Sequence, residues 1–230
     1  MSDSKREKQD LENPILNPPV WSNIYYRKIQ LRNGIENVVQ RYLTGRKKQT
    51  LVDYGCGTKP YEPIFSPYVS EYLGLDIEDS EHVDHVLSED GTSSLPDNTA
   101  DVVLSSQVLE HVPNPELYLN EVHRILKKDG LLILSTHGHM IYYPVPKDYW
   151  RWTHEGLRKT LAGANLAVKE MKGIIGVTAA GGGNLFLMGF DPCFQRDFML
   201  PSTSVCKGSF AFWTTISSIR TGIGMLLSFS

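Results

Sequence analysis

Short apolar runs that recur along the chain constrain the fold of this 230-residue protein more than any other feature. They are separated by stretches of helical periodicity, and the first ends at a glycine motif while the second ends in an acid. The runs lie at residues 50–54, 71–76, 82–87, 100–105 and 131–136. Short, wholly apolar runs are typical of strands buried on both faces, as in parallel sheets covered by helices. The pattern therefore predicts an α/β fold, and residues 166–172 and 184–190 predict a final antiparallel pair of strands.

Composition along the chain predicts three parts. Residues 1–20 are polar and contain prolines, which predicts a flexible N-terminal arm. Residues 21–190 hold the periodic segments and predict a single domain. This domain begins with helical periodicity at 21–44, where Gly34 is a weak point, so the segment forms either one broken helix or two short ones. Residues 191–230 have no clear period, and we predict only a C-terminal extension of uncertain structure.

Two further helices are marked by their ends. Asn114 predicts a helix start, because its side chain can accept a hydrogen bond from the first turn. Lys127 and Lys128 suit the last turn of that helix, where the dipole favours cations, and Gly130 suits its end. Thr153 predicts the N-cap of the next helix.

Composition also excludes several classes of protein. With 41% hydrophobic and 21% charged residues, the chain is globular rather than disordered. A formal charge of −3 argues against a nucleic-acid partner, which would need a basic surface. Three widely separated cysteines predict neither a disulfide framework nor a metal site. The sequence also shows no apolar leader and no apolar run long enough to cross a membrane, so we expect a cytoplasmic protein. Contact with a membrane surface is allowed only through the apolar C-terminal stretches.

The first apolar run ends in the motif DYGCG, residues 53–57, which predicts a ligand site. Gly55 and Gly57 allow the backbone to approach a ligand closely, although a tight structural turn uses glycine too. Asp76 ends the next run, where a carboxylate can accept hydrogen bonds from both hydroxyls of a ribose. The pair indicates a nucleoside-containing ligand, either a dinucleotide or S-adenosylmethionine. Pro60 disfavours the dinucleotide, whose motif has a third glycine there.

The motifs DYGCG and LGLD, followed by the long segment LPDNTADVVLSSQVLEHVPNPELYLNEVHRILKKDGLLILST, resemble class I S-adenosylmethionine-dependent methyltransferases of the type-11 kind. The resemblance covers roughly residues 50–137. It implies a Rossmann-like, seven-stranded, mostly parallel sheet with helices on both faces and the last strand antiparallel. It also implies S-adenosylmethionine as the cofactor.

The resemblance carries over to individual cofactor-binding residues. Asp53, Gly55 and Gly57 would border the methionine end of the cofactor, and Asp76 would hold its ribose. Asp90 would lie near the adenine, with Glu89 as an alternative alignment. Two residues after the fourth strand would line the site beneath the sulfonium. They are Ser106 and Gln107.

Residues 137–153 are similar to a segment of methyltransferases associated with saccharide or lipid modification, so a small-molecule, saccharide or lipid-linked acceptor is implied. Their aromatic side chains either wall an acceptor pocket or only cover the sheet. The chain lacks an Asn-Pro-Pro-Tyr type motif, which disfavours methylation of base nitrogens and leaves oxygen as the favoured atom. A hydroxyl acceptor needs a base. The candidates are His137, His111, Asp148 and His139, and each of them also has a purely structural interpretation.

Two other functions stay open on the sequence. An NAD-type oxidoreductase would share the glycine motif and the acid, although Pro60 and the pattern of residues 90–137 disfavour it. A non-catalytic module that binds S-adenosylmethionine would keep both features and lack transfer.

Overall fold

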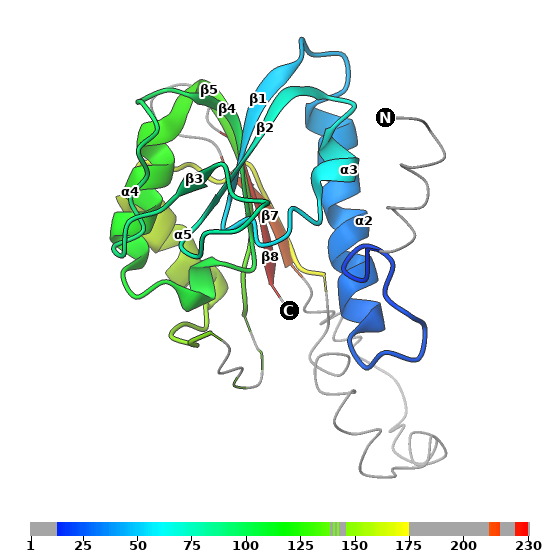
Figure 1. The fold of residues 1–230 in the computed structure, drawn as a ribbon. Helices are drawn as coiled ribbons and strands as arrows, with labels where there is room; N and C mark the ends of the chain where they lie inside the picture. The colour runs from blue at the N-terminus through cyan, green and yellow to red at the C-terminus, as the bar shows by residue number, and fades with distance from the viewer. Residues whose placement is uncertain are drawn as a thin grey trace.

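The computed structural model describes residues 13–138, 140, 142 and 146–174, together with the backbone of 212–216 and 224–229. A central sheet has helices against both faces (Figure 1). The helices are α2 (Tyr25–Tyr42), α3 (Glu62–Phe65), the 3₁₀ helix η1 (Leu109–His111), α4 (Pro115–Ile125) and α5 (His154–Gly163). The strands are β1 (Gln49–Tyr54), β2 (Val69–Asp76), β3 (His85–Val86), β4 (Ala100–Ser106), β5 (Leu126–Ser135), β6 (Glu170–Lys172), β7 (Phe212–Ile216) and β8 (Gly224–Phe229).

Five strands form the parallel part of the sheet in the order β3-β2-β1-β4-β5. The chain moves outward from β1 through β2 to β3 and then returns to place β4 on the other side of β1. In open parallel sheets, ligands bind at the carboxyl ends of the strands where this reversal occurs. The fold therefore places a crevice beside the ends of β1 and β4.

Strand residues alternate between two cores. Val52, Val103 and Leu132 face a core that α4 and α5 complete. Their neighbours, among them Leu51 and Val102, face a second core that α2 and α3 complete. This two-sided burial is why the strands are continuous apolar runs, and the predicted mostly parallel α/β sheet with helices on both faces is confirmed.

The predicted number of seven strands is wrong. Five parallel strands are followed on the β5 side by three more, and the pairings of β7 with β5, β6 and β8 are antiparallel. Strand β8 pairs parallel with β5 and β6. The predicted strand at 166–172 is shortened to β6, and its expected partner at 184–190 lies outside the described residues.

The predicted end of helix α4 is also wrong. The helix ends at Ile125, and Lys127, Lys128 and Gly130 belong to β5. Pairing with the sheet explains the early end, since Leu126 is already opposite Ala100 of β4. The Lys127 ammonium also binds the Asp101 carboxylate of the neighbouring strand at 2.8 Å.

The predicted break at Gly34 is wrong, because helix α2 runs unbroken through this residue, which is buried. The predicted caps of the two later helices are confirmed. The Asn114 side chain accepts a hydrogen bond from the Leu117 amide at 3.1 Å and caps α4. Thr153 Oγ1 accepts one from the Gly156 amide at 3.1 Å and caps α5.

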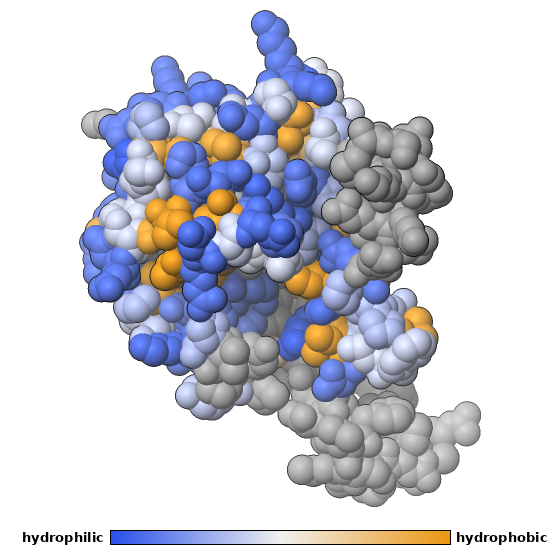
Figure 2. Space-filling view, viewed as in Figure 1, coloured by the Kyte–Doolittle hydropathy of each residue, from blue (hydrophilic) through white to orange (hydrophobic). Residues whose placement is uncertain are grey.

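The N-terminal segment before α2 packs against the domain. Leu16 is buried in the α2–α3 core, and Asn13 Nδ2 donates to the Pro60 carbonyl at 2.8 Å. On the face drawn in Figure 2, hydrophobic residues form small separate groups among hydrophilic ones. None of the helices in the described part of the chain has the length and apolar character needed to cross a membrane.

Candidate functional site

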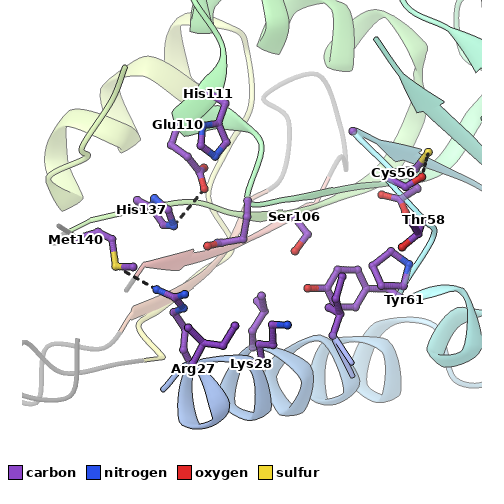
Figure 3. Close-up of a pocket in the computed structure, with 18 residues that line it drawn as sticks. Arg27, Lys28, Cys56, Thr58, Tyr61, Ser106, Glu110, His111, His137 and Met140 are labelled. Atoms are coloured by element: carbon purple, nitrogen blue, oxygen red, sulfur yellow. Dashed lines mark hydrogen bonds and ion pairs between the residues drawn. The ribbon is translucent and has the colours of Figure 1, made fainter. Parts of the chain in front are cut away.

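A cavity of about 420 Å³ lies at the crevice beside the ends of β1 and β4. This volume is in the usual range of small-molecule sites. The strand ends form one wall and helix α2 forms the opposite wall (Figure 3). Its lining includes seven residues that the sequence indicated: Asp53, Gly55, Gly57, Ser106, Gln107, His111 and His137.

The glycine turn after β1 is held by hydrogen bonds to β2. The amides of Gly55 and Cys56 both donate to the Leu75 carbonyl, at 2.8 and 3.0 Å. Gly55 and Gly57 have positive φ angles, +82° and +51°, which side-chain-bearing residues rarely adopt. A Cβ added at Gly57 would meet no heavy atom within 4 Å. The turn thus leaves open space for a ligand beside its backbone.

Asp76 lies at the rim of this turn. Its Oδ2 accepts a hydrogen bond from the Gly57 amide at 2.8 Å, and its Oδ1 accepts one from the Ile77 amide at 2.7 Å. The side chain is thereby fixed beside the exposed Gly57, although it does not belong to the cavity lining. The two features that the sequence paired, the glycine turn and the acid, are in direct contact.

Asp53 is a buried acid that lines the cavity beneath the turn. Its Oδ2 accepts a hydrogen bond from the Tyr72 hydroxyl at 2.6 Å. Burial raises the pKa of Asp53 to about 7, and the Tyr72 hydrogen bond only partly opposes this shift. Burial likewise raises the pKa of the nearby Cys56 thiol to about 12, so this thiol stays protonated and unreactive at neutral pH.

The end of β4 contributes Ser106 and Gln107. Gln107 has a positive φ of +60°, and its Nε2 donates to Ser135 Oγ on β5 at 3.1 Å. Ser106 Oγ is within 3.1 Å of the same Ser135 hydroxyl. Both residues are therefore fixed by β5 while they line the cavity.

Glu110 and His137 form a buried pair at the far end of the cavity. Glu110 is fully buried and accepts a hydrogen bond from the Thr136 hydroxyl at 2.8 Å. Its other oxygen lies 3.4 Å from His137 Nε2 and has no hydrogen-bond partner among the described residues. Burial raises the pKa of Glu110 to about 7 and lowers that of His137 to about 3. The imidazole is therefore neutral, and its Nδ1 has no hydrogen-bond partner among the described residues.

Two other base candidates are already bonded within the protein. His111 lines the cavity, but its Nδ1 bonds the Lys147 carbonyl. Asp148 does not line the cavity, because its carboxylate is buried in an ion pair with the Arg151 guanidinium. The fourth candidate, His139, lies outside the described residues.

Asp90, the adenine candidate, lies in an exposed loop and does not line the cavity. Its Oδ1 accepts hydrogen bonds from the Thr92 amide and hydroxyl, which lower its pKa. The loop is tied to β1 because the Tyr54 hydroxyl bonds the Gly91 carbonyl.

Several lining residues were missed by the sequence analysis. Helix α2 contributes Arg27, Lys28 and Leu31, its N-cap residue is Ile24, and the segment after the glycine turn contributes Tyr61. The helical periodicity of 21–44 located the helix without showing how it docks, so it did not tell which side chains reach the site. Glu110 was missed because nothing in the sequence shows that this acid is buried.

The residues present fit an adenosyl cofactor. The glycine turn offers open backbone beside the cavity, and the Asp76 carboxylate is held at the same rim where ribose hydroxyls can reach it. Beyond the turn, the cavity extends past Ser106 toward His137 (Figure 3).

A family model described as "Methyltransferase domain" matches residues 26–167 of the chain. The chain belongs to this family. The resemblance to class I S-adenosylmethionine-dependent methyltransferases is confirmed. The match covers helices α2 and α5 as well as strands β1 to β5. The methyltransferase domain therefore includes the α2 wall of the cavity.

Among curated relatives, an uncharacterized methyltransferase of Mycobacterium sp. (strain JLS) is 34% identical over 96 residues, which is 38% of each protein. The match thus spans about two fifths of that relative's length. A SAM dependent methyltransferase from Aquifex aeolicus has a similar structure, with a TM-score of 0.50 at 18% identity over 76% of this chain and 93% of that chain. The [4+2]-cyclase SpnF is equally similar, with a TM-score of 0.50 at 18% identity over 73% of each chain. The fold alone therefore does not fix the reaction.

Proposed function

We propose that this protein transfers a methyl group from S-adenosylmethionine to an oxygen atom of a small-molecule, saccharide or lipid-linked acceptor. The observation that carries the proposal is the 2.8 Å hydrogen bond between the Gly57 amide and the Asp76 carboxylate at the glycine turn. This contact brings together the glycine turn and the acid, the two features that we propose recognise an adenosyl group. The dispersed cysteines still favour the cytoplasm, and the net charge of −3 disfavours nucleic acid as the acceptor.

Each cofactor-binding residue has a proposed part. Asp76 accepts hydrogen bonds from the ribose hydroxyls, and Gly55 and Gly57 let the methionine end lie against the backbone. Asp53 lies beneath that end, and its pKa near 7 allows either protonation state there. Asp90 is proposed to lie near the adenine, because its loop is bonded to the end of β1 through Tyr54. Ser106 and Gln107, held by Ser135, line the space in front of the sulfonium.

S-adenosylmethionine supplies a sulfonium methyl group, which passes to the acceptor nucleophile and leaves S-adenosylhomocysteine. The protein's main task is then to hold the acceptor in line and exclude water, which contributes up to roughly 7–11 kcal/mol in well-oriented reactions. A hydroxyl acceptor must also lose its proton. A positioned base contributes roughly a factor of 10²–10⁴.

We propose His137 as that base. Its imidazole is neutral, lines the cavity and keeps Nδ1 without a partner in the described part of the chain. A pKa of about 3 makes it a weak base until a bound acceptor that carries negative charge raises this pKa. His111 and Asp148 are the alternatives, and their bonds to Lys147 and Arg151 favour a positioning part for both.

A thermal-shift comparison tests the cofactor class. S-adenosylhomocysteine is expected to raise the unfolding midpoint of the wild-type protein, since a ligand that binds only the folded state stabilises it. NADH is the matched control and is expected to leave the midpoint unchanged. A shift with NADH alone would favour the oxidoreductase and contradict the proposal.

Transfer itself needs a second experiment. The protein is incubated with S-adenosylmethionine labelled in the methyl group and with fractions of a cell extract. A labelled product that depends on His137 is the expected result. Binding of S-adenosylhomocysteine without any labelled product would favour the non-catalytic module.

A further inference from the structure

The cavity has two ends of different chemistry. Cys56, Thr58 and Tyr61 gather at the end formed by the glycine turn (Figure 3). Glu110 and His137 lie at the other end, together with Met140. If the cofactor occupies the glycine end, as proposed above, then the His137 end is left for the acceptor.

Helix α2 presents two cations along the wall that joins these ends. Arg27 and Lys28 both line the cavity, and their side chains rise from the helix toward the sheet (Figure 3). The Arg27 guanidinium extends to the His137 end, where Nη1 lies 3.6 Å from the sulfur of Met140. The Lys28 ammonium lies nearer the middle and donates to the Pro14 carbonyl at 3.0 Å.

The positive charges on helix α2 affect the pKa values of groups that line the cavity. After burial, the nearby Arg151 and Arg27 guanidinium groups also lower the pKa of His137. The pKa of Lys28 is lowered by burial and then by Arg27. An anion between the two side chains would relieve their mutual repulsion.

The sheet wall does little to offset these cations. The carboxyl groups among the lining residues are Asp53 and Glu110. Burial raises the pKa of each to about 7, so at neutral pH neither is fully ionised. The cavity is therefore electropositive on the α2 side, which favours an anionic ligand.

We propose that Arg27 and Lys28 form a subsite for an anionic group, a phosphate or a carboxylate, carried by the methyl acceptor. The inference rests on the proposed function, because it assumes that the cofactor occupies the glycine end. The cofactor has a carboxylate of its own, so it is the competing source of the anion. The position of Arg27 beside Met140, at the His137 end, favours the acceptor.

The test uses inorganic phosphate as the probe and full-length protein, with and without saturating S-adenosylhomocysteine. Phosphate binding is followed by phosphorus NMR line broadening, and cofactor binding by calorimetry. The variant is Arg27→Gln/Lys28→Gln. The matched control, Arg41→Gln/Lys47→Gln, removes the same charge from two positions that do not line the cavity.

Wild-type protein and the control are expected to bind phosphate whether or not S-adenosylhomocysteine is present. The cavity variant should lose about tenfold or more in phosphate affinity, as expected when charge-assisted hydrogen bonds are removed. Its affinity for S-adenosylhomocysteine should stay within about twofold of wild type. Weak phosphate binding that is equal in all proteins means an adventitious ion only and overturns the proposal.

A third ligand separates the two sources of the anion. 5′-Methylthioadenosine has the adenosyl thioether of the cofactor without its carboxylate. If the cavity variant binds S-adenosylhomocysteine less tightly but 5′-methylthioadenosine normally, the cations hold the cofactor's carboxylate, and the acceptor subsite is refuted. If wild-type protein binds neither adenosyl ligand, the proposed function itself fails. The phosphate titration tests only the anion subsite, so the two failures are distinguishable.

Discussion

Replacing Gly55 with alanine tests how the glycine turn is built. Gly55 has a φ of +82°, and an added Cβ would lie 2.5 Å from Cγ2 of Val108 and 3.1 Å from its Cγ1. Valine is stiff about χ1, so Val108 cannot easily turn both methyl groups away. Gly57 is the matched control, since its φ is also positive, at +51°, but an added Cβ there meets open space.

The structure separates two costs. An L-residue in the left-handed region costs about 1–2 kcal/mol, and both variants bear this cost. Overpacking a filled site adds about 1–3 kcal/mol, and only Gly55→Ala bears that. We therefore expect Gly57→Ala to lose about 1 kcal/mol of unfolding free energy and Gly55→Ala about 3 kcal/mol. For a domain of this size the larger loss lowers the melting temperature by roughly 6–12 °C.

Urea unfolding followed by circular dichroism measures both losses. Calorimetry at a temperature where both variants are folded should show that Gly57→Ala loses more affinity for S-adenosylhomocysteine than Gly55→Ala does. The Cβ at Gly57 points into open space beside the cavity, so Gly57→Ala should lower affinity out of proportion to its small loss of stability. Equal destabilisation of the two variants would refute the steric argument at Val108.

Three further results are expected. Folding raises the pKa of Asp53 from 3.8 to about 7, so its contribution to stability is full below about pH 4 and is lost as the pH rises to about 7. The stability of Asp53→Asn relative to wild type should therefore grow across this range in urea titrations, and a constant difference would contradict the raised pKa. The imidazole resonance of His137 should not titrate between about pH 8 and 5 by NMR, and a midpoint near 6.5 would contradict its burial. Asn114→Ala should cost about 1 kcal/mol in urea unfolding, since Leu117 loses its cap, and no loss would show that solvent replaces it.

The strands and the glycine turn were predictable because local sequence determines them. Burial on both faces favours apolar residues in the middle of β1 and β4, and a positive φ together with the close approach of Val108 requires glycine at Gly55. The position of the acid at the end of β2, next to the glycine turn, was also predictable, because the carboxyl ends of parallel strands lie at one edge of the sheet. The contact of Asp76 with Gly57 is a direct consequence.

Features that depend on docking were not predictable. Lys127 and Lys128 suit a helix end as well as a strand start, and only the pairing of β5 with β4 decides between them. The carboxylate of Asp148 looked available for catalysis until its pairing with Arg151 was seen. Arg27 is one of many cations in the sequence, and its place in the cavity depends on how α2 lies against the sheet.

The most direct test of the account is calorimetric titration of S-adenosylhomocysteine into Asp76→Ala, with Asp79→Ala as the control. Asp79 is an exposed acid three positions further along the chain. Loss of two charge-assisted hydrogen bonds to ribose predicts at least about hundredfold weaker binding for Asp76→Ala and normal binding by the control. The unfolding midpoint of Asp76→Ala should fall as well, because the Gly57 and Ile77 amides lose their acceptor, so binding is compared at a temperature where the variant is folded. Affinity within about threefold of wild type in the folded Asp76→Ala protein would contradict the claim that this carboxylate holds an adenosyl ribose.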